Sequence, residues 1–182
     1  MHLRWFLVWL SIGLFGCSTI ELDEVNPTGV DLSGVWVLDA ANSDLTPDFK
    51  EGLGGRQRQR RPNDQIAGQR RDILGATGSD FAFISHDFEV LGAQQLVIEQ
   101  NHDSMGIAHE PGVYRDVSWG ERQRGLWEIY AGWEENDLLI LSKAKSMSVQ
   151  ERYRLSSRRL TVEITIQADS AERTLRRVYT RR

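Results

Sequence analysis

A run of arginines is the most unusual local feature of this sequence. Arg56, Arg58, Arg60 and Arg61 follow one another within six positions. A guanidinium group binds phosphate well because its planar fork donates two hydrogen bonds at once. The run therefore predicts contact with anionic lipid head groups, lipopolysaccharide phosphates or an acidic partner. The alternative is a solvated loop, since residues 54–65 contain no apolar side chain and we expect 51–63 to be mobile.

Charged side chains also occur within otherwise apolar strand patterns. Glu151 alternates with Val149, Tyr153 and Leu155, and Arg177 alternates with Leu175 and Tyr179. A similar face is formed by Leu126, Glu128 and Tyr130. A buried charge needs a partner, so we expect Glu151 and Arg177 to pair inside the fold, unless they line a polar ligand cavity or the faces are reversed. The candidate ligand-binding residues are Trp36, Trp127, Tyr130, Tyr153, Glu151 and Arg177.

Signals for catalysis or metal binding are weak. His86, His102, His109 and Asp103 are the conceivable metal cluster, but no recurrent metal-ligand spacing connects them. The sequence contains no nucleophile elbow, phosphate-binding loop or zinc-protease helix. We therefore expect no catalytic residue, no metal and no cofactor.

These side chains would be positioned mainly by β-strands. Residues 160–167 alternate strictly between Leu, Val or Ile and polar side chains, which is typical of a strand with one buried face. Short connections favour antiparallel neighbours, and closing the sheet removes its exposed edges. We predict an antiparallel meander of about nine strands closed as a barrel, with strands at 32–39, 96–100, 105–109, 113–119, 125–133, 138–143, 147–155, 160–167 and 173–179.

The insertion at 45–95 is too long for a hairpin connection. Asn63 or Asp64 is a suitable cap for a short helix that would end at Gly75. In residues 80–91, apolar side chains recur with helical spacing, although part of the segment also suits a strand. We expect one or two short helices here, with the second across one end of the sheet.

The first strand carries a resemblance to a known family. Gly34-Val35-Trp36 resembles the Gly-x-Trp signature of lipocalin-type barrels, in which a late arginine packs over the tryptophan. Residues 32–39, Ser43-Asp44 and residues 177–181 together resemble a set of uncharacterised exported bacterial proteins with lipocalin-like architecture. This resemblance implies a lipocalin-like barrel with Arg177 or Arg181 over Trp36, and the strand pattern favours Arg177. That family has no established activity to transfer.

The N-terminus predicts export. Residues 1–16 combine Arg4 with an apolar run too short to span a bilayer, as in a secretory signal peptide. Leu14-Phe15-Gly16-Cys17 resembles the lipobox of bacterial lipoproteins, in which the cysteine is lipidated after cleavage. An uncleaved anchor, or an ordinary signal with a stray cysteine, is the alternative. The resemblance implies a palmitate-bearing Cys17, a tether at 17–30, a domain at 31–182 and, with Ser18 next, the outer membrane.

The overall composition narrows the function further. The chain has 182 residues and a formal net charge of −4, which excludes a global electrostatic footprint for nucleic acid. We therefore expect an outer-membrane lipoprotein, facing the periplasm, with a non-catalytic role in binding a small amphipathic or apolar ligand in the barrel. The alternative is an envelope scaffold with a filled barrel that contacts anionic lipid through the arginine run. An empty barrel interior would favour the first interpretation, and a filled one the second.

Overall fold

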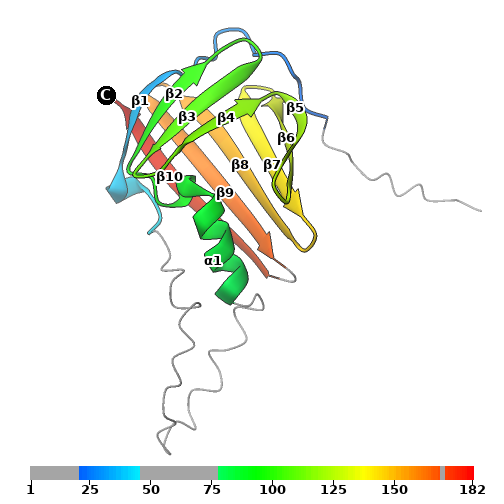
Figure 1. Cartoon of the computed structure of the whole chain (residues 1–182). Helices are drawn as coiled ribbons and strands as arrows, with labels where there is room; N and C mark the ends of the chain where they lie inside the picture. Colours follow the sequence, from blue (N-terminus) through cyan, green and yellow to red (C-terminus); the bar gives the residue numbers. More distant parts are fainter. Residues whose placement is uncertain (1–20, 46–77, 169–170) are drawn as a thin grey trace, which may run out of the picture.

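The computed structural model describes residues 21–45, 78–168 and 171–182, and the side chains from residue 83 onward in the first helix (Figure 1). Ten antiparallel strands form one sheet in the order β4-β3-β2-β1-β10-β9-β8-β7-β6-β5. The strands are β1 Gly34–Leu38, β2 Gln95–Gln100, β3 Ser104–Glu110, β4 Tyr114–Ser118, β5 Gly120–Arg124, β6 Trp127–Glu134, β7 Asp137–Ala144, β8 Met147–Ser156, β9 Arg159–Ala168 and β10 Ala171–Arg181.

The first and last strands of the chain, β1 and β10, pair with each other in the middle of the sheet order. Trp36 lies opposite Arg181, and Leu38 lies opposite Tyr179. Short turns join most of the sequential antiparallel neighbours, as between β8 and β9, where Ser156 pairs with Arg159. The connection from β1 to β2 is long, and β4 does not pair with β5. The predicted fold class, a mainly β antiparallel barrel, is confirmed, with ten strands in place of about nine.

The additional strand is β5, which occupies the connection expected between the predicted strands 113–119 and 125–133. Its sequence Gly-Glu-Arg-Gln-Arg contains no apolar side chain, and most of it is exposed. A strand at a sheet edge does not need a buried face, so the usual alternation is missing. Backbone pairing with β6, from Gly120 opposite Ala131 to Arg124 opposite Trp127, defines it instead.

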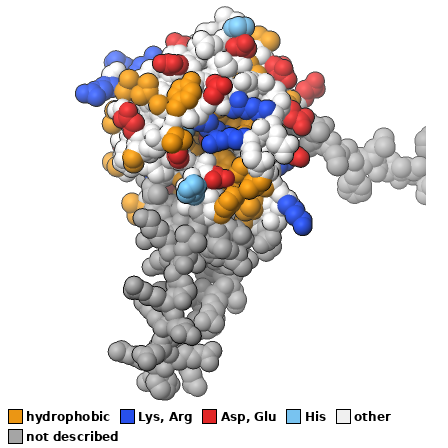
Figure 2. Space-filling model, viewed as in Figure 1, with side chains coloured by type: hydrophobic (Ala, Val, Ile, Leu, Met, Phe, Trp, Pro, Cys, Tyr) orange, Lys and Arg blue, Asp and Glu red, His pale blue; other side chains and the backbone are white. Residues whose placement is uncertain are grey.

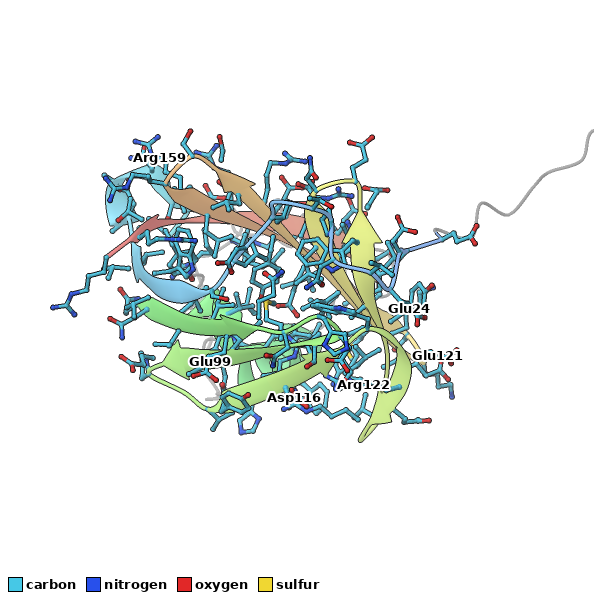
Figure 3. The ribbon with its side chains drawn as sticks, turned by 90° about the horizontal axis from the view of Figure 1, so that it is seen from above. Glu24, Glu99, Asp116, Glu121, Arg122 and Arg159 are labelled. Carbon is cyan, nitrogen blue, oxygen red and sulfur yellow. The ribbon has the colours of Figure 1, made fainter. Side chains whose placement is uncertain are left out.

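The barrel is nearly closed, with a seam between β4 and β5. These strands are consecutive in the chain, joined through Trp119, yet they occupy the two opposite edges of the sheet order and share no ladder. The Arg122 side chain crosses the seam, donating hydrogen bonds to the backbone oxygen of Asp116 and, at 3.4 Å, to Ser118 Oγ (Figure 3). Side-chain contacts therefore replace backbone pairing at this place.

One α-helix covers one end of the barrel. α1 spans Gly78–Asp87; the 3-10 turn η1 Ala40–Asn42 precedes it in the chain, and η4 Glu89–Leu91 follows it (Figure 1). Ile84 of α1 is fully buried, and Phe88 just after it is nearly so. The helical interpretation of residues 80–91 is confirmed. The helix predicted from Asn63 or Asp64, and the arginine run 56–61, lie outside the described residues. No helix in the described part of the chain has the length and apolar character to cross a bilayer.

The barrel axis is filled by its own side chains. Trp36, Trp133, Tyr153 and Tyr179 are all fully buried, together with Leu, Ile and Val from every strand between β6 and β10. On β6, the buried residues are Trp127, Ile129, Ala131 and Trp133. The prediction that Leu126, Glu128 and Tyr130 form the dry face was therefore wrong by one residue. Leu126 lies in the turn before the strand, and counting it as part of the strand pattern shifted the predicted register by one residue.

Residues 22–30, which we call the strap, lie along the end of the barrel opposite α1. Leu22 is 4% exposed. Asp23 forms an antiparallel bridge to Trp133, with backbone hydrogen bonds of 2.9 and 2.8 Å. Asn26 accepts from Trp133 Nε1 at 3.1 Å and donates to Asn101 O at 2.7 Å. We expected 17–30 to be a tether, and the described part of it is instead attached to the barrel.

Candidate functional site

A cavity of about 300 Å³ lies between α1 and the turn that joins β5 to β6. Antiparallel strands alternate their turns between the two ends of a barrel, so this turn shares one end with α1, while the β6–β7 turn shares the other with the strap. We call this cavity the α1 pocket. It is lined by Phe83, Asp87, Phe88, Arg115, Arg124, Gly125, Leu126, Trp127, Ile129 and Ser142.

Three aromatic rings form the apolar wall of the α1 pocket. Phe88 meets Trp127 edge-on, with ring centroids 5.0 Å apart, and Phe83 stacks on Trp127 at 6.3 Å. Trp127 is held in place because its Nε1 donates to Asp87 Oδ2 at 2.8 Å. Phe83 and Leu126 remain 39% and 49% exposed, so the pocket opens to solvent between them. Figure 2 shows apolar side chains gathered beside cationic ones on this side of the molecule.

A buried ion pair lies beneath the α1 pocket. Arg115 Nη1 donates to Glu151 Oε1 at 2.5 Å, and Tyr153 OH donates to Glu151 Oε2 at 2.8 Å. Glu151 is fully buried and Arg115 is 7% exposed. Burial acts to lower the pKa of Arg115, but the nearby Glu151 carboxylate outweighs it and the pKa is raised. Burial, followed by Glu151, raises the pKa of Tyr153. Glu151 thus has two donors and is charge-compensated.

Two polar atoms at the α1 pocket lack hydrogen-bond partners among the described residues. They are Arg115 Nε and Ser142 Oγ, and both are buried. A buried donor without an acceptor costs roughly 1–3 kcal/mol. Both residues line the cavity, so a molecule that entered it would meet a donor that needs an acceptor and a hydroxyl able to act as either. The wall therefore suits a ligand with an apolar body and at least one acceptor group.

The predicted pair of Glu151 and Arg177 is wrong, although both side chains face inward as expected. Arg177 Nη1 donates to Asp44 O at 3.1 Å and Nη2 to Ala93 O at 3.4 Å, near α1. The curvature of the sheet brings Glu151 to Arg115 of β4 across the barrel instead. Arg176 faces out, so the predicted register of the last strand is correct.

The arginine that covers Trp36 is Arg181, with its guanidinium carbon 4.6 Å from the ring centroid. We favoured Arg177 for this contact, and that choice was wrong. Trp36 lies opposite Arg181 in the β1–β10 ladder, so the two side chains are direct cross-strand neighbours. Arg181 also donates to Asp31 O at 3.0 Å, which holds the guanidinium over the ring.

The six predicted ligand-binding residues do not form one cluster. Trp127 lines the α1 pocket, and Glu151 and Tyr153 lie beneath it through Arg115. Trp36 is buried under Arg181, Tyr130 is half-buried on the outer face, and Arg177 lies beside Ala93. Arg115 and Ser142 were missed. Arg115 alternates with Val117 on a predicted strand, and that pattern, applied as it was to Arg177, would have indicated an inward arginine.

The histidines are far from equivalent. The side chains of His86 and His102 are 89% and 92% exposed, whereas that of His109 is 2% exposed. Burial is the main reason why the pKa of His109 is lowered, opposed by the carboxylates of Glu151 and Glu89. Within the described residues, no three His, Cys, Asp or Glu side chains come together as a metal site would require.

No protein-family model and no curated protein matches this chain. Among solved structures, the chain is similar to the fluorescent protein UnaG, with 15% identity and a TM-score of 0.49 over 83% of this chain and 97% of that one. Two single-residue mutants of UnaG give TM-scores of 0.48 and 0.47 at 15% and 16% identity, over 83% and 82% of this chain and 96% and 95% of theirs. Similarity at this level says nothing about what this chain binds.

Proposed function

We propose that this protein is a non-catalytic binding protein that holds a small amphipathic molecule in the α1 pocket. The observation that carries the proposal is the pair of buried atoms without partners, Arg115 Nε and Ser142 Oγ, on the wall of a cavity whose other side is aromatic. A cavity of about 300 Å³ is at the lower end of the range for small-molecule sites. It would hold one ring system or a short chain with a polar group.

The filled barrel axis limits where that molecule is bound. Trp36, Trp133, Tyr153 and Tyr179 occupy the interior without exposure, so the ligand belongs at the α1 end rather than in the barrel centre. The apolar part would lie against Phe83, Phe88 and Trp127. Its acceptor would lie toward Arg115 and Ser142.

The filled axis also favours a second candidate function. A barrel packed with its own side chains suits an envelope scaffold whose outer surface contacts other components. In that case the arginine run 56–61, outside the described residues, would contact anionic lipid or lipopolysaccharide. The two candidates differ in whether the α1 pocket has an occupant.

We further propose that the chain is an outer-membrane lipoprotein anchored through Cys17, with its domain in the periplasm. The support comes from the sequence: a short apolar leader, a lipobox-like Leu-Phe-Gly-Cys and a single cysteine placed at the expected cleavage site. An acyl chain supplies about 0.8 kcal/mol per buried methylene, which makes two or more chains a stable anchor.

The test is to identify what the protein carries when it is purified without denaturation. Mass spectrometry of an organic extract from the wild-type protein should detect a small amphipathic molecule in near-stoichiometric amount. Ser142→Ile should lose it, because the larger side chain enters the cavity and removes the hydroxyl.

The matched control is Ser156→Ile, at the exposed end of β8 and outside the pocket, which should keep the molecule. Equal retention of the molecule by both variants would show that it is not bound in the α1 pocket. A wild-type extract with no small molecule, together with a melting temperature that added lipids do not raise, would favour the scaffold.

A further inference from the structure

We infer that the barrel is held with its strap end toward the anchoring membrane and that the α1 pocket opens away from it. This inference rests on the proposed lipidation of Cys17. It adds an orientation, and with it the source of the ligand: the aqueous space or an opposing surface, rather than the bilayer that carries the anchor.

The first step is the attachment of the strap. Leu22 is buried, Asp23 is bridged to Trp133, and Asn26 joins Trp133 to Asn101 of the β2–β3 turn. The fit is tight at Gly132, where an added Cβ would lie 2.7 Å from Leu22 Cβ and 2.8 Å from Asp23 O. At Gly120 a Cβ would lie 2.8 Å from Glu24 Oε1. The strap is therefore part of the barrel from residue 22 onward.

The second step is the length of chain between anchor and strap. Cys17 precedes Leu22 by five residues. A fully extended chain covers at most about 3.6 Å per residue, so the anchor lies within about 18 Å of the strap whatever its conformation.

The third step is the length of the barrel. From Trp133, where the strap is bridged, the chain of β6 leads back to Gly125 at the mouth of the α1 pocket, a separation of eight residues. A strand rises about 3.3 Å per residue, which places the mouth about 26 Å from the bridge. From Asp23 in the same bridge, the six residues back to Cys17 reach at most about 22 Å when fully extended. Because this reach is shorter than the distance to the pocket mouth, the acylated cysteine cannot arrive there.

The charge of the strap end does not reverse this orientation. Figure 3, which views this end from above, labels Glu24, Glu99, Asp116 and Glu121 together with Arg122 and Arg159, so the end carries charges of both signs. The acidic side chains would be repelled by an anionic leaflet, but exposed charges are screened over about 8 Å at physiological ionic strength. A covalent anchor worth about 0.8 kcal/mol per methylene outweighs that repulsion.

The test compares two fluorescent donors on the full-length, lipidated protein in phosphatidylcholine vesicles that contain a head-group acceptor dye. Asn136→Cys places the donor in the β6–β7 turn at the strap end, and Lys145→Cys places it in the β7–β8 turn at the pocket end. Both positions are exposed, and acylation leaves no free thiol at Cys17. Energy transfer should be several-fold more efficient from position 136 than from position 145.

A control variant with twenty Gly and Ser residues inserted between Thr19 and Ile20 should lose most of this difference, because the barrel is then free to turn. Equal transfer from both donors without the insertion, or greater transfer from position 145, would overturn the orientation. If the protein is not acylated and does not bind the vesicles, the proposed orientation is rejected together with the proposed anchor. The ligand extract of the wild-type and Ser142→Ile proteins reports separately on the pocket.

Discussion

A single buried imidazole gives this barrel a dependence on pH. His109 Nδ1 lies 3.3 Å from Val113 O and 3.8 Å from Glu89 Oε2, while Nε2 has no partner among the described residues. Arg115, Glu151 and Glu89 are the charged groups that act on the ring. Burial lowers the pKa of His109 below its ordinary 6.5, so the unfolded chain takes up a proton first as pH falls. The stabilisation that comes from keeping His109 neutral should therefore be fully present above about pH 6.5, and the free energy of unfolding should decrease below that pH.

His109→Gln should flatten this part of the stability profile, since glutamine does not titrate. Urea denaturation from pH 8 to pH 5 measures it. His102→Gln is the matched control, because that side chain is 92% exposed and should leave the profile unchanged. A His109→Gln protein with the wild-type slope between pH 6.5 and 5 would contradict the assignment.

The two neighbouring arginines of β10 differ sharply in what they contribute. Arg177 is 3% exposed and donates to Asp44 O and Ala93 O, whereas Arg176 is exposed and reaches Asn42 O at 3.2 Å. Arg177→Ala removes both hydrogen bonds and leaves a cavity where the buried side chain lay, so we expect a loss of about 2–4 kcal/mol. Arg176→Ala should cost less than about 0.5 kcal/mol.

Chemical denaturation of the two alanine variants compares these values directly. Equal losses, or a larger loss for Arg176→Ala, would show that the burial assigned to the last strand is wrong. The wild-type protein and both variants should share one m-value, because the same surface is exposed on unfolding.

Which side chains face inward could be read from the sequence, but their partners could not. Alternation over 149–155 and 175–179 places Glu151, Tyr153 and Arg177 correctly. The contact of Glu151 with Arg115 crosses the barrel between strands that are far apart in sheet order, so it depends on how strongly the sheet curls. The contact of Arg181 with Trp36 depends on the register of closure. Neither quantity is encoded in a local pattern.

Between elements, the Arg115–Glu151 pair connects edge strand β4 to β8 on the other side of the barrel. Glu151→Ala would leave the Arg115 guanidinium buried without its carboxylate, and Tyr153 OH without its acceptor. Removing one member of a buried pair costs about 3–5 kcal/mol. We expect a loss of that size in urea denaturation, with β4 becoming the first strand to lose amide protection in hydrogen exchange.

The double variant Glu151→Leu with Arg115→Met separates burial of charge from packing. Apolar side chains of similar size need no compensation, so most of the lost stability should return. If the double variant is as unstable as Glu151→Ala, the cost lies in shape rather than in charge.

The strap can be tested as an element by changing the residue beneath it. Gly132→Ala places a methyl group where Leu22 Cβ and Asp23 O already lie, so the strap must move. We expect residues 22–30 to become open to limited proteolysis while the barrel stays folded, with a stability loss of about 1–3 kcal/mol. Gly92→Ala is the control, because nothing lies within 4 Å of its added Cβ. A wild-type cleavage pattern in Gly132→Ala would count against attachment.

Strong local patterns predicted the long central strands well, and the pattern failed at edge strand β5. β8 and β9 alternate over ten residues each, and their bounds lie close to the prediction. β5 has no apolar residue, so its strand conformation comes from pairing with β6 alone. The strap likewise lacks apolar periodicity, and it is attached by the buried Leu22, the backbone bridge of Asp23 and the side-chain hydrogen bonds of Asn26. The α1 pocket was missed because it joins α1 to β4, β6 and β7, which only the folded topology brings together.

For the whole molecule, the proposed anchor makes a direct prediction about delivery. Cys17→Ala removes the thiol that would carry the acyl chains, so the protein should leave the membrane fraction or remain uncleaved. Fractionation followed by mass measurement of the mature N-terminus checks this outcome. The barrel itself should keep its melting temperature, since Cys17 precedes the strap. Unchanged membrane association of a fully processed Cys17→Ala protein would contradict the lipoprotein assignment.

The pairing of β1 with β10 has a consequence for the time at which this protein is able to fold. Trp36 and Arg181 lie at opposite ends of the described domain, yet they are ladder neighbours. During synthesis or translocation, a chain that still lacks its final residues can pair β1 only with β2, so the other edge of β1 and the Trp36 side chain remain open to water. Loop closure over such a separation is slow compared with local hairpin formation. The pairing of β1 with β10, and with it the complete barrel, can therefore form only after the last strand has been released.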